Sequence, residues 1–108
     1  EKIARIYITE QWWERLLELL QSDPTLHRLE LYGDYLTAHY ADEVVALYEH
    51  CIIDYLRENT GRNFYKNACR YLRRMKKMGA GKRVDEIIVQ LKKEHPARYA
   101  LFEELDKV

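Results

Sequence analysis

Residues with the chemistry for metal binding or acid–base catalysis are few in this chain, and they do not converge. The four histidines are His27, His39, His50 and His95. None lies three or four residues from another histidine or from a cysteine, although His50 adjoins Cys51. Neighbouring residues on a helix point about 100° apart, so this last pair does not share one tetrahedral metal ion. We therefore expect no metal site.

The carboxylates and the glycine-containing segment do not predict a catalytic site either. Pairs such as Asp42–Glu43 and Glu103–Glu104 are adjacent in sequence and fall near expected helix ends, where solvated side chains are typical. The segment Gly79-Ala80-Gly81-Lys82 lacks the preceding strand and the longer loop whose backbone N–H groups wrap a phosphate. It predicts a turn between helices. We expect a protein that is not an enzyme and that has no cofactor.

One stretch of the sequence is strongly basic. Between residues 62 and 83 there are nine basic residues and no acidic one, namely Arg62, Lys66, Arg70, Arg73, Arg74, Lys76, Lys77, Lys82 and Arg83. On a helical wheel Lys66, Arg70, Arg73 and Lys77 lie together, roughly opposite an apolar stripe. With the neighbouring Arg74 they form the cationic face, and these five residues are the candidate site.

Three roles for the cationic face stay open at this point. It can neutralise phosphates of a nucleic acid and release their counterions. It can bind an acidic protein partner. It can also be solvated, or paired with acidic residues of the same fold, because the charge is unevenly spread. The formal net charge is zero, but residues 1–61 carry a balance of −7 and residues 62–108 a balance of +7.

Two adjacent tryptophans are the other unusual feature. Because Trp12 and Trp13 are neighbours, their side chains can hardly both point to the centre of one helix bundle. Aromatic residues are enriched at interfaces, and Trp12 is therefore a candidate contact with another domain or a protein partner. The alternative is a broad buried face that takes both rings.

The two cysteines and the hydropathy pattern bear on location. Cys51 and Cys69 fall on expected helix faces, and free cysteine is among the most buried residue types, so we expect two reduced core thiols. This usage suits a reducing compartment. No run of 18 apolar residues and no signal-peptide pattern occurs, so we expect a cytoplasmic protein without a membrane partner. Because the sequence opens on Glu1 rather than Met, we expect an excised piece of a longer protein.

The apolar residues recur at helical spacing along almost the whole chain, and no strand is predicted. Short loops make successive helices antiparallel neighbours. The sequence therefore predicts an all-α fold in which residues 1–108 form a single domain. We expect five to six short antiparallel helices, arranged as a bundle of helical hairpins similar to tetratricopeptide repeats.

Caps and helix breakers set the expected boundaries. Residues 2–8 are either the end of a helix or an extended lead-in. Thr9 is expected to cap the next helix, and Pro24 to take the first position of the helix after that. Gly33 lies within this later helix, where we expect it to allow close packing rather than to end the helix. Further helices are expected over about 41–58 and 62–78, and after the turn at residues 79–81. Pro96 ends that helix and is expected to open a last short one.

The second half of the chain resembles a known family. The motifs are Arg62 with Tyr65, Tyr71-Leu72-Arg73-Arg74-Met75-Lys76-Lys77-Met78-Gly79, Ile87-Ile88 with Leu91-Lys92, and Ala100-Leu101-Phe102-Glu103-Glu104-Leu105. They are similar to the C-terminal helical region of bacterial SWIM zinc-finger proteins, over about residues 60–108. The resemblance implies a role in binding nucleic acid or protein. The zinc-binding motif itself is absent, so zinc ligation is assigned to no residue here.

Together these features predict a non-catalytic helical accessory or interaction domain of a larger bacterial protein. A protein partner or an upstream domain is its expected ligand. The alternative is a nucleic-acid-binding module that uses the cationic face.

Overall fold

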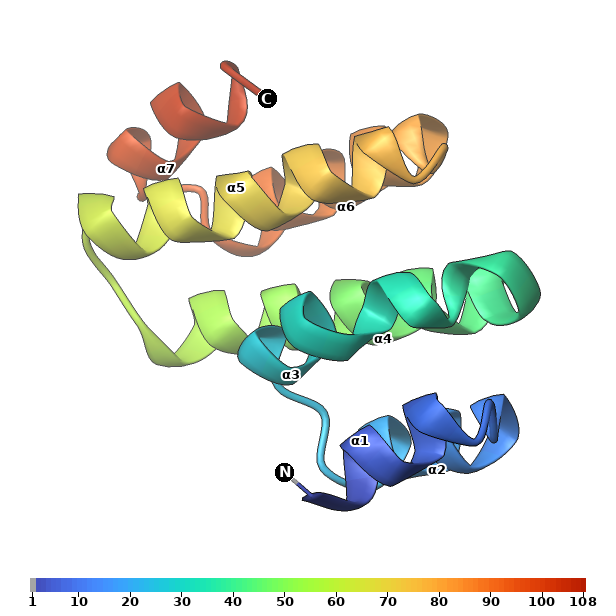
Figure 1. The fold of residues 1–108 in the computed structure, drawn as a ribbon. Helices are drawn as coiled ribbons and strands as arrows, with labels where there is room; N and C mark the ends of the chain where they lie inside the picture. The colour runs from blue at the N-terminus through green and yellow to red at the C-terminus, as the bar shows by residue number, and fades with distance from the viewer. Residues whose placement is uncertain (1) are drawn as a thin grey trace. The chain divides into compact units, whose positions relative to one another are not determined.

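A computed structural model describes residues 2–108, which form seven α-helices and one 3₁₀-helix and contain no strand (Figure 1). The all-α class is confirmed, whereas the expected count of five to six helices is wrong. The chain divides into two compact units, one ending at Cys51 and the other running from Ile52 to Val108. Within residues 2–108, none of the helices combines the length and the apolar character that crossing a lipid bilayer requires.

The first unit opens with two helices that pack side by side, α1 (Lys2–Thr9) and α2 (Trp13–Ser22) (Figure 1). Residues 2–8 are thus helical. Thr9 ends α1 instead of capping the next helix, because Gln11 adopts a left-handed conformation with a φ of 57° and reverses the chain. Trp12 is the residue before α2, and its side chain makes no capping hydrogen bond.

The next helix, α3 (Leu26–Tyr32), begins two residues later than Pro24 predicts. Thr25 has an extended backbone and its hydroxyl accepts a hydrogen bond from the backbone N–H of Arg28 at 3.1 Å. This bond satisfies one of the free N–H groups of the first turn, so Thr25 is the N-cap. The Asp23 carbonyl accepts a bond from the Arg28 guanidinium at 2.7 Å and fixes the preceding turn.

The α-helical path ends before Gly33, which opens the 3₁₀-helix η1 (Gly33–Tyr35), so the expectation that the helix continues through this glycine is wrong. A Cβ atom at Gly33 would lie 3.5 Å from Val44 and 3.8 Å from the Tyr48 hydroxyl, which are ordinary van der Waals contacts, so the packing at this position does not require a glycine. Helix α4 (Thr37–Glu58) contains a kink at Tyr40, and the helical segment after this kink begins at the expected residue 41. Val44 and Tyr48 are fully buried in the core of the first unit.

The second unit contains the end of α4 and three further helices, α5 (Arg62–Lys77), α6 (Gly81–Glu94) and α7 (Tyr99–Leu105). Figure 1 shows α5 and α6 side by side, and α5 also packs on α7. Its core consists of fully buried side chains from all four elements: Ile52, Leu56, Ala68, Leu72, Met75, Val84, Leu91 and Leu101. A Leu→Ala change at such a site costs about 2–5 kcal/mol.

The last helix starts at Tyr99, three residues after the predicted start at Pro96. The Arg98 guanidinium donates hydrogen bonds to the backbone carbonyl of Leu56 and, at 3.4 Å, to that of Asn59. The backbone N–H of Arg98 bonds the carbonyl of His95 at 3.1 Å. These contacts hold residues 95–98 as a turn against the end of α4, and the helix begins only after that turn.

Gly61 and Gly79 bound α5 with positive φ values of 129° and 89°. The ψ of 151° at Gly61 places it in a region that only glycine adopts without strain. We expect Gly61→Ala to destabilise the second unit by about 1–3 kcal/mol. Gly81→Ala is the matched control, because Gly81 is helical and nothing lies within 4 Å of its Cβ position. Chemical denaturation of both variants measures the difference, and equal unfolding free energies would contradict the assignment.

His95 makes the stability of the second unit depend on pH. It is half-buried, and its Nε2 atom is buried without a hydrogen-bond partner. Burial lowers the pKa of His95, and the nearby cations Arg98 and Arg57 add to this effect against the opposing charge of Glu94. Because the folded-state pKa lies below the unfolded value of about 6.5, stability is complete above that pH. It decreases as the pH falls from there to the folded-state pKa.

We therefore expect the melting temperature to fall between pH 7.5 and the folded-state pKa of His95, and His95→Gln to flatten this dependence. His27→Gln is the control, because His27 is exposed. Circular dichroism melts across this pH range provide the measurement. An unchanged pH profile in His95→Gln would show that His95 does not cause the effect.

Candidate anion-binding face on α5

Helix α5 separates an apolar side from a cationic side. Its buried residues are Tyr65, Ala68, Cys69, Tyr71, Leu72 and Met75. Phe64, although apolar, is 40% exposed. It lies in the first turn of α5, where Tyr55 covers only part of its ring in an edge-on contact at 5.9 Å. Packing of the buried stripe fixes the rotation of α5 and so turns its basic side chains outward.

Four of the five predicted residues of the cationic face are exposed: Lys66, Arg70, Arg73 and Lys77. Arg74 is half-buried and lies at the border of the packed side. Lys66, Arg73 and Lys77 form no ion pair with any carboxylate of residues 52–108. From Lys66 to Lys77 the face extends about 16 Å along the helix axis, at 1.5 Å per residue.

Arg70 is held in place on this face. Its guanidinium lies 4.5 Å from the centre of the Tyr71 ring, and its Nη2 atom donates to the Asn67 side-chain oxygen at 3.3 Å. A cation stacked on an aromatic ring has fewer rotamers to lose when it binds an anion. Arg70 is therefore the best-ordered cation of the exposed set.

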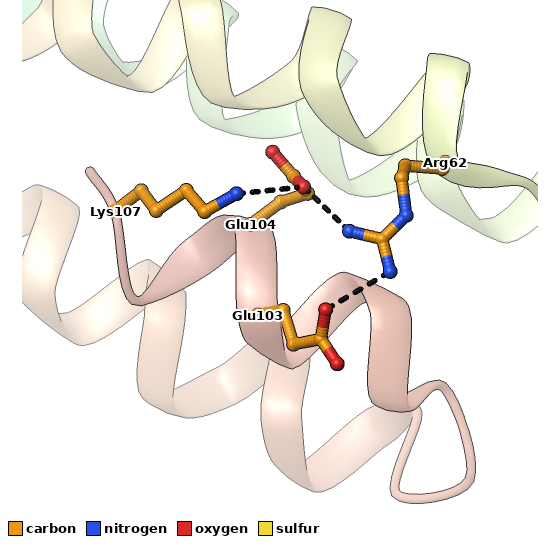
Figure 2. Close-up of polar contacts among 4 residues, drawn as sticks. All are labelled: Arg62, Glu103, Glu104 and Lys107. Carbon is orange, nitrogen blue, oxygen red and sulfur yellow. Dashed lines mark hydrogen bonds and ion pairs between the residues drawn. The ribbon is translucent and has the colours of Figure 1, made fainter.

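Two other basic residues of α5 point to the C-terminal segment instead. Figure 2 shows the Arg62 guanidinium between Glu103 and Glu104 of α7, donating to the first at 2.9 Å and to the second at 2.7 Å. Lys107 donates to the same Glu104 oxygen at 3.3 Å. Lys76 donates to the backbone carbonyl of Val108 at 2.9 Å. Arg62 and Lys76 therefore attach the C-terminal segment to α5 and do not belong to the open face.

The buried carboxylate of Glu104 corrects a prediction. Glu103 and Glu104 were both expected to be solvated, but Glu104 is only 3% exposed. Burial by itself would raise the pKa of Glu104, but the hydrogen bonds from Arg62 and Lys107 outweigh it and lower the pKa. The pKa of Arg62 is raised by its bonds to Glu103 and Glu104. Glu104 lies three residues after Leu101, on the same buried stripe, which was the available sequence signal.

The two neighbouring carboxylates in Figure 2, Glu103 and Glu104, differ in how far they are exposed to solvent. The Glu104 side chain is 5% exposed and that of Glu103 is 63% exposed. Glu104→Gln removes the buried negative charge that pairs with Arg62 and Lys107, so we expect the melting temperature to fall clearly. Glu103→Gln removes only a solvent-screened surface contact, so we expect the melting temperature to change little. Thermal melts at pH 7 test this order. Equal losses in the two variants would show that burial of Glu104 adds nothing.

The two cysteines lie inside the fold. Cys51 and Cys69 are both buried and unbridged, as predicted. Burial raises the pKa of the Cys69 thiol to about 11, and the nearby Arg73 opposes this only in part. Cys69 is therefore a protonated thiol at neutral pH, and the thiolate is the reactive form. Among residues 2–108, no group of three or more His, Cys, Asp or Glu residues lies close enough to hold a metal ion.

Trp12, the predicted protein contact, belongs to the first unit and is 43% exposed. The Arg15 guanidinium lies 4.6 Å from the centre of the Trp12 ring, and the Tyr7 ring is tilted against it at 6.1 Å. Trp13 is half-buried and stacks on Tyr35 at 6.4 Å. The two tryptophan rings thus have different neighbours, and only Trp13 is a residue of α2 itself.

Comparisons of the chain with protein-family models, with curated proteins and with solved structures find no match.

Proposed function

We propose that this chain is a non-catalytic interaction domain that binds an anionic partner through the cationic face of α5. The observation that carries the proposal is the set of exposed cations Lys66, Arg73 and Lys77, which form no ion pair with a carboxylate of residues 52–108. A cationic surface of this kind attracts anions over about 10 Å at 0.1 M salt. It binds them by releasing their counterions.

Within this proposal, nucleic acid is the partner class that we test first, because its phosphates are the anions that exposed cations neutralise. The aromatic ring nearest the exposed cations, Tyr71, is 4% exposed and lies under Arg70, so it offers no surface for base stacking. Contacts of the cations with phosphates alone do not depend on base sequence. We therefore expect binding of duplex and single strands without strong sequence preference. An acidic protein surface is the other partner class.

The proposed biological context of the domain rests on the resemblance of residues 60–108 to bacterial SWIM zinc-finger proteins. We propose that the domain serves a larger bacterial cytoplasmic protein, and that α1–α2 in the first unit and α5–α6 in the second are each a helical hairpin similar to a tetratricopeptide repeat. The buried stripes of these helices supply rigidity, and the exposed Trp12 of the first unit is a second proposed contact.

Fluorescence anisotropy with labelled DNA and RNA tests the proposal at about 50 and 200 mM salt. The triple variant Lys66→Glu, Arg73→Glu and Lys77→Glu removes three exposed cations. If each neutralises one phosphate of duplex DNA, the slope of log K against log[salt] decreases in magnitude by about 2.7. Wild-type protein should bind more weakly as the salt increases.

The matched control is the triple variant Lys2→Glu, Arg5→Glu and Lys93→Glu. It changes the net charge by the same amount at exposed positions outside α5. We expect it to keep most of the affinity and the salt slope. No binding by wild-type protein at low salt would exclude nucleic acid and leave an acidic protein as the partner. Equal effects of the two triple variants would show that only net charge matters.

A further inference from the structure

A pocket in the first unit has features that the cationic face of α5 does not explain. It has a volume of about 600 Å³ and lies between the turn that joins α1 to α2 and the beginning of α4. Pockets that bind small molecules measure about 300–1,000 Å³. Its lining consists of Gln11, Trp12, Trp13, Glu14, Arg15, His39 and Tyr40. Three aromatic rings and three ionisable side chains therefore face one space.

The backbone is irregular on both sides of this pocket. Gln11 is the one non-glycine residue among residues 2–108 with a positive φ. Such a residue is held in place only by its surroundings, and such conformations gather at binding sites. On the opposite side, Tyr40 has non-helical backbone angles inside α4. The two irregular positions bring the tryptophans and His39 to the same pocket.

The charges of the pocket are mixed and unpaired. The Arg15 guanidinium is held over the Trp12 ring at 4.6 Å, yet it forms no ion pair with a carboxylate of residues 2–108. Glu14 and His39 are exposed and likewise form no ion pair within the described chain. A ligand that is only an anion would meet the charge of Glu14, and one that is only a cation would meet the charge of Arg15.

We propose that this pocket binds a small zwitterionic ligand with an aromatic ring, of which an aromatic α-amino acid is the simplest example. Its carboxylate pairs with Arg15, with His39 as a further donor, because a stacked guanidinium still presents N–H groups along its edge. Its ammonium group faces Glu14 and the indole rings. Its ring packs on the exposed aromatic surface of the pocket. This site is independent of anion binding by α5.

Three probes of one shape separate the charges: phenylalanine is zwitterionic, phenethylamine has only the cation, and 3-phenylpropionate has only the anion. The chain has two tryptophans and both line the pocket, so their indole N–H signals in ¹⁵N-labelled protein report binding directly. We expect phenylalanine to bind with a Kd of about 1 mM, and each single-charge probe about tenfold more weakly.

Two variants test the assignment of each charge. Arg15→Met should weaken phenylalanine and 3-phenylpropionate about tenfold and leave phenethylamine unchanged, whereas Glu14→Gln should weaken phenylalanine and phenethylamine. Arg5→Met is the matched control, because Arg5 is exposed and does not line the pocket. All three positions are on the surface, and circular dichroism verifies folding.

Several outcomes would overturn the proposal. These are the absence of indole shifts with phenylalanine up to about 10 mM, equal binding of the three probes, or identical responses of Arg15→Met and Arg5→Met. The triple charge-reversal variant of α5 should bind phenylalanine normally. Arg15→Met should bind nucleic acid normally, so failure of one proposal is distinguishable from failure of the other.

Discussion

Everything proposed for α5 depends on how this helix is fixed in rotation. Its buried stripe, with Ala68, Leu72 and Met75 fully enclosed, sets which side faces outward. The Arg62 guanidinium adds a specific constraint, because it binds two carboxylates of α7 and one of them is buried. A buried carboxylate is tolerated only where its charge is paired, so Glu104 restricts the position in which α7 can pack on α5.

The same constraint divides the basic residues into two groups. Arg62 and Lys76 hold the C-terminal segment, and their charges are used within the fold. Lys66, Arg73 and Lys77 are turned outward, where their charges are available to a partner. A count of basic residues in the sequence does not separate these groups. The separation comes from the helix α7, which covers one side of α5 only.

Local signals predicted the part of the fold that depends on neighbouring residues. The extent of α5 follows from the positive-φ glycines at both ends and from its amphipathic pattern, so its predicted boundaries were correct within a residue. Thr9, Pro24 and Pro96 were misassigned for another reason. Their roles depend on Gln11, Thr25 and Arg98, whose conformations or partners the surrounding turns decide.

The candidate site was predictable only in part. Lys66, Arg70, Arg73 and Lys77 are exposed, as a helical wheel indicates, whereas Arg74 is half-buried. The pairing of Arg62 with Glu104 joins residues 42 apart, and no periodic pattern shows which distant charges meet. The pocket beside Trp12 was also hidden, because it depends on a left-handed residue and on a helix kink that follow no common sequence rule.

The buried cysteines have a practical consequence. Cys51 is the last residue of the first compact unit, and Cys69 lies within the second. Each unit therefore contains one enclosed thiol, and an alkylating reagent can modify it only when that part of the chain opens. The rate of modification at each cysteine, resolved by peptide mass spectrometry, follows the opening of the structure around that cysteine. The sequence thus carries two internal reporters, one in α4 and one in α5, so local opening can be followed at both positions without any engineered label.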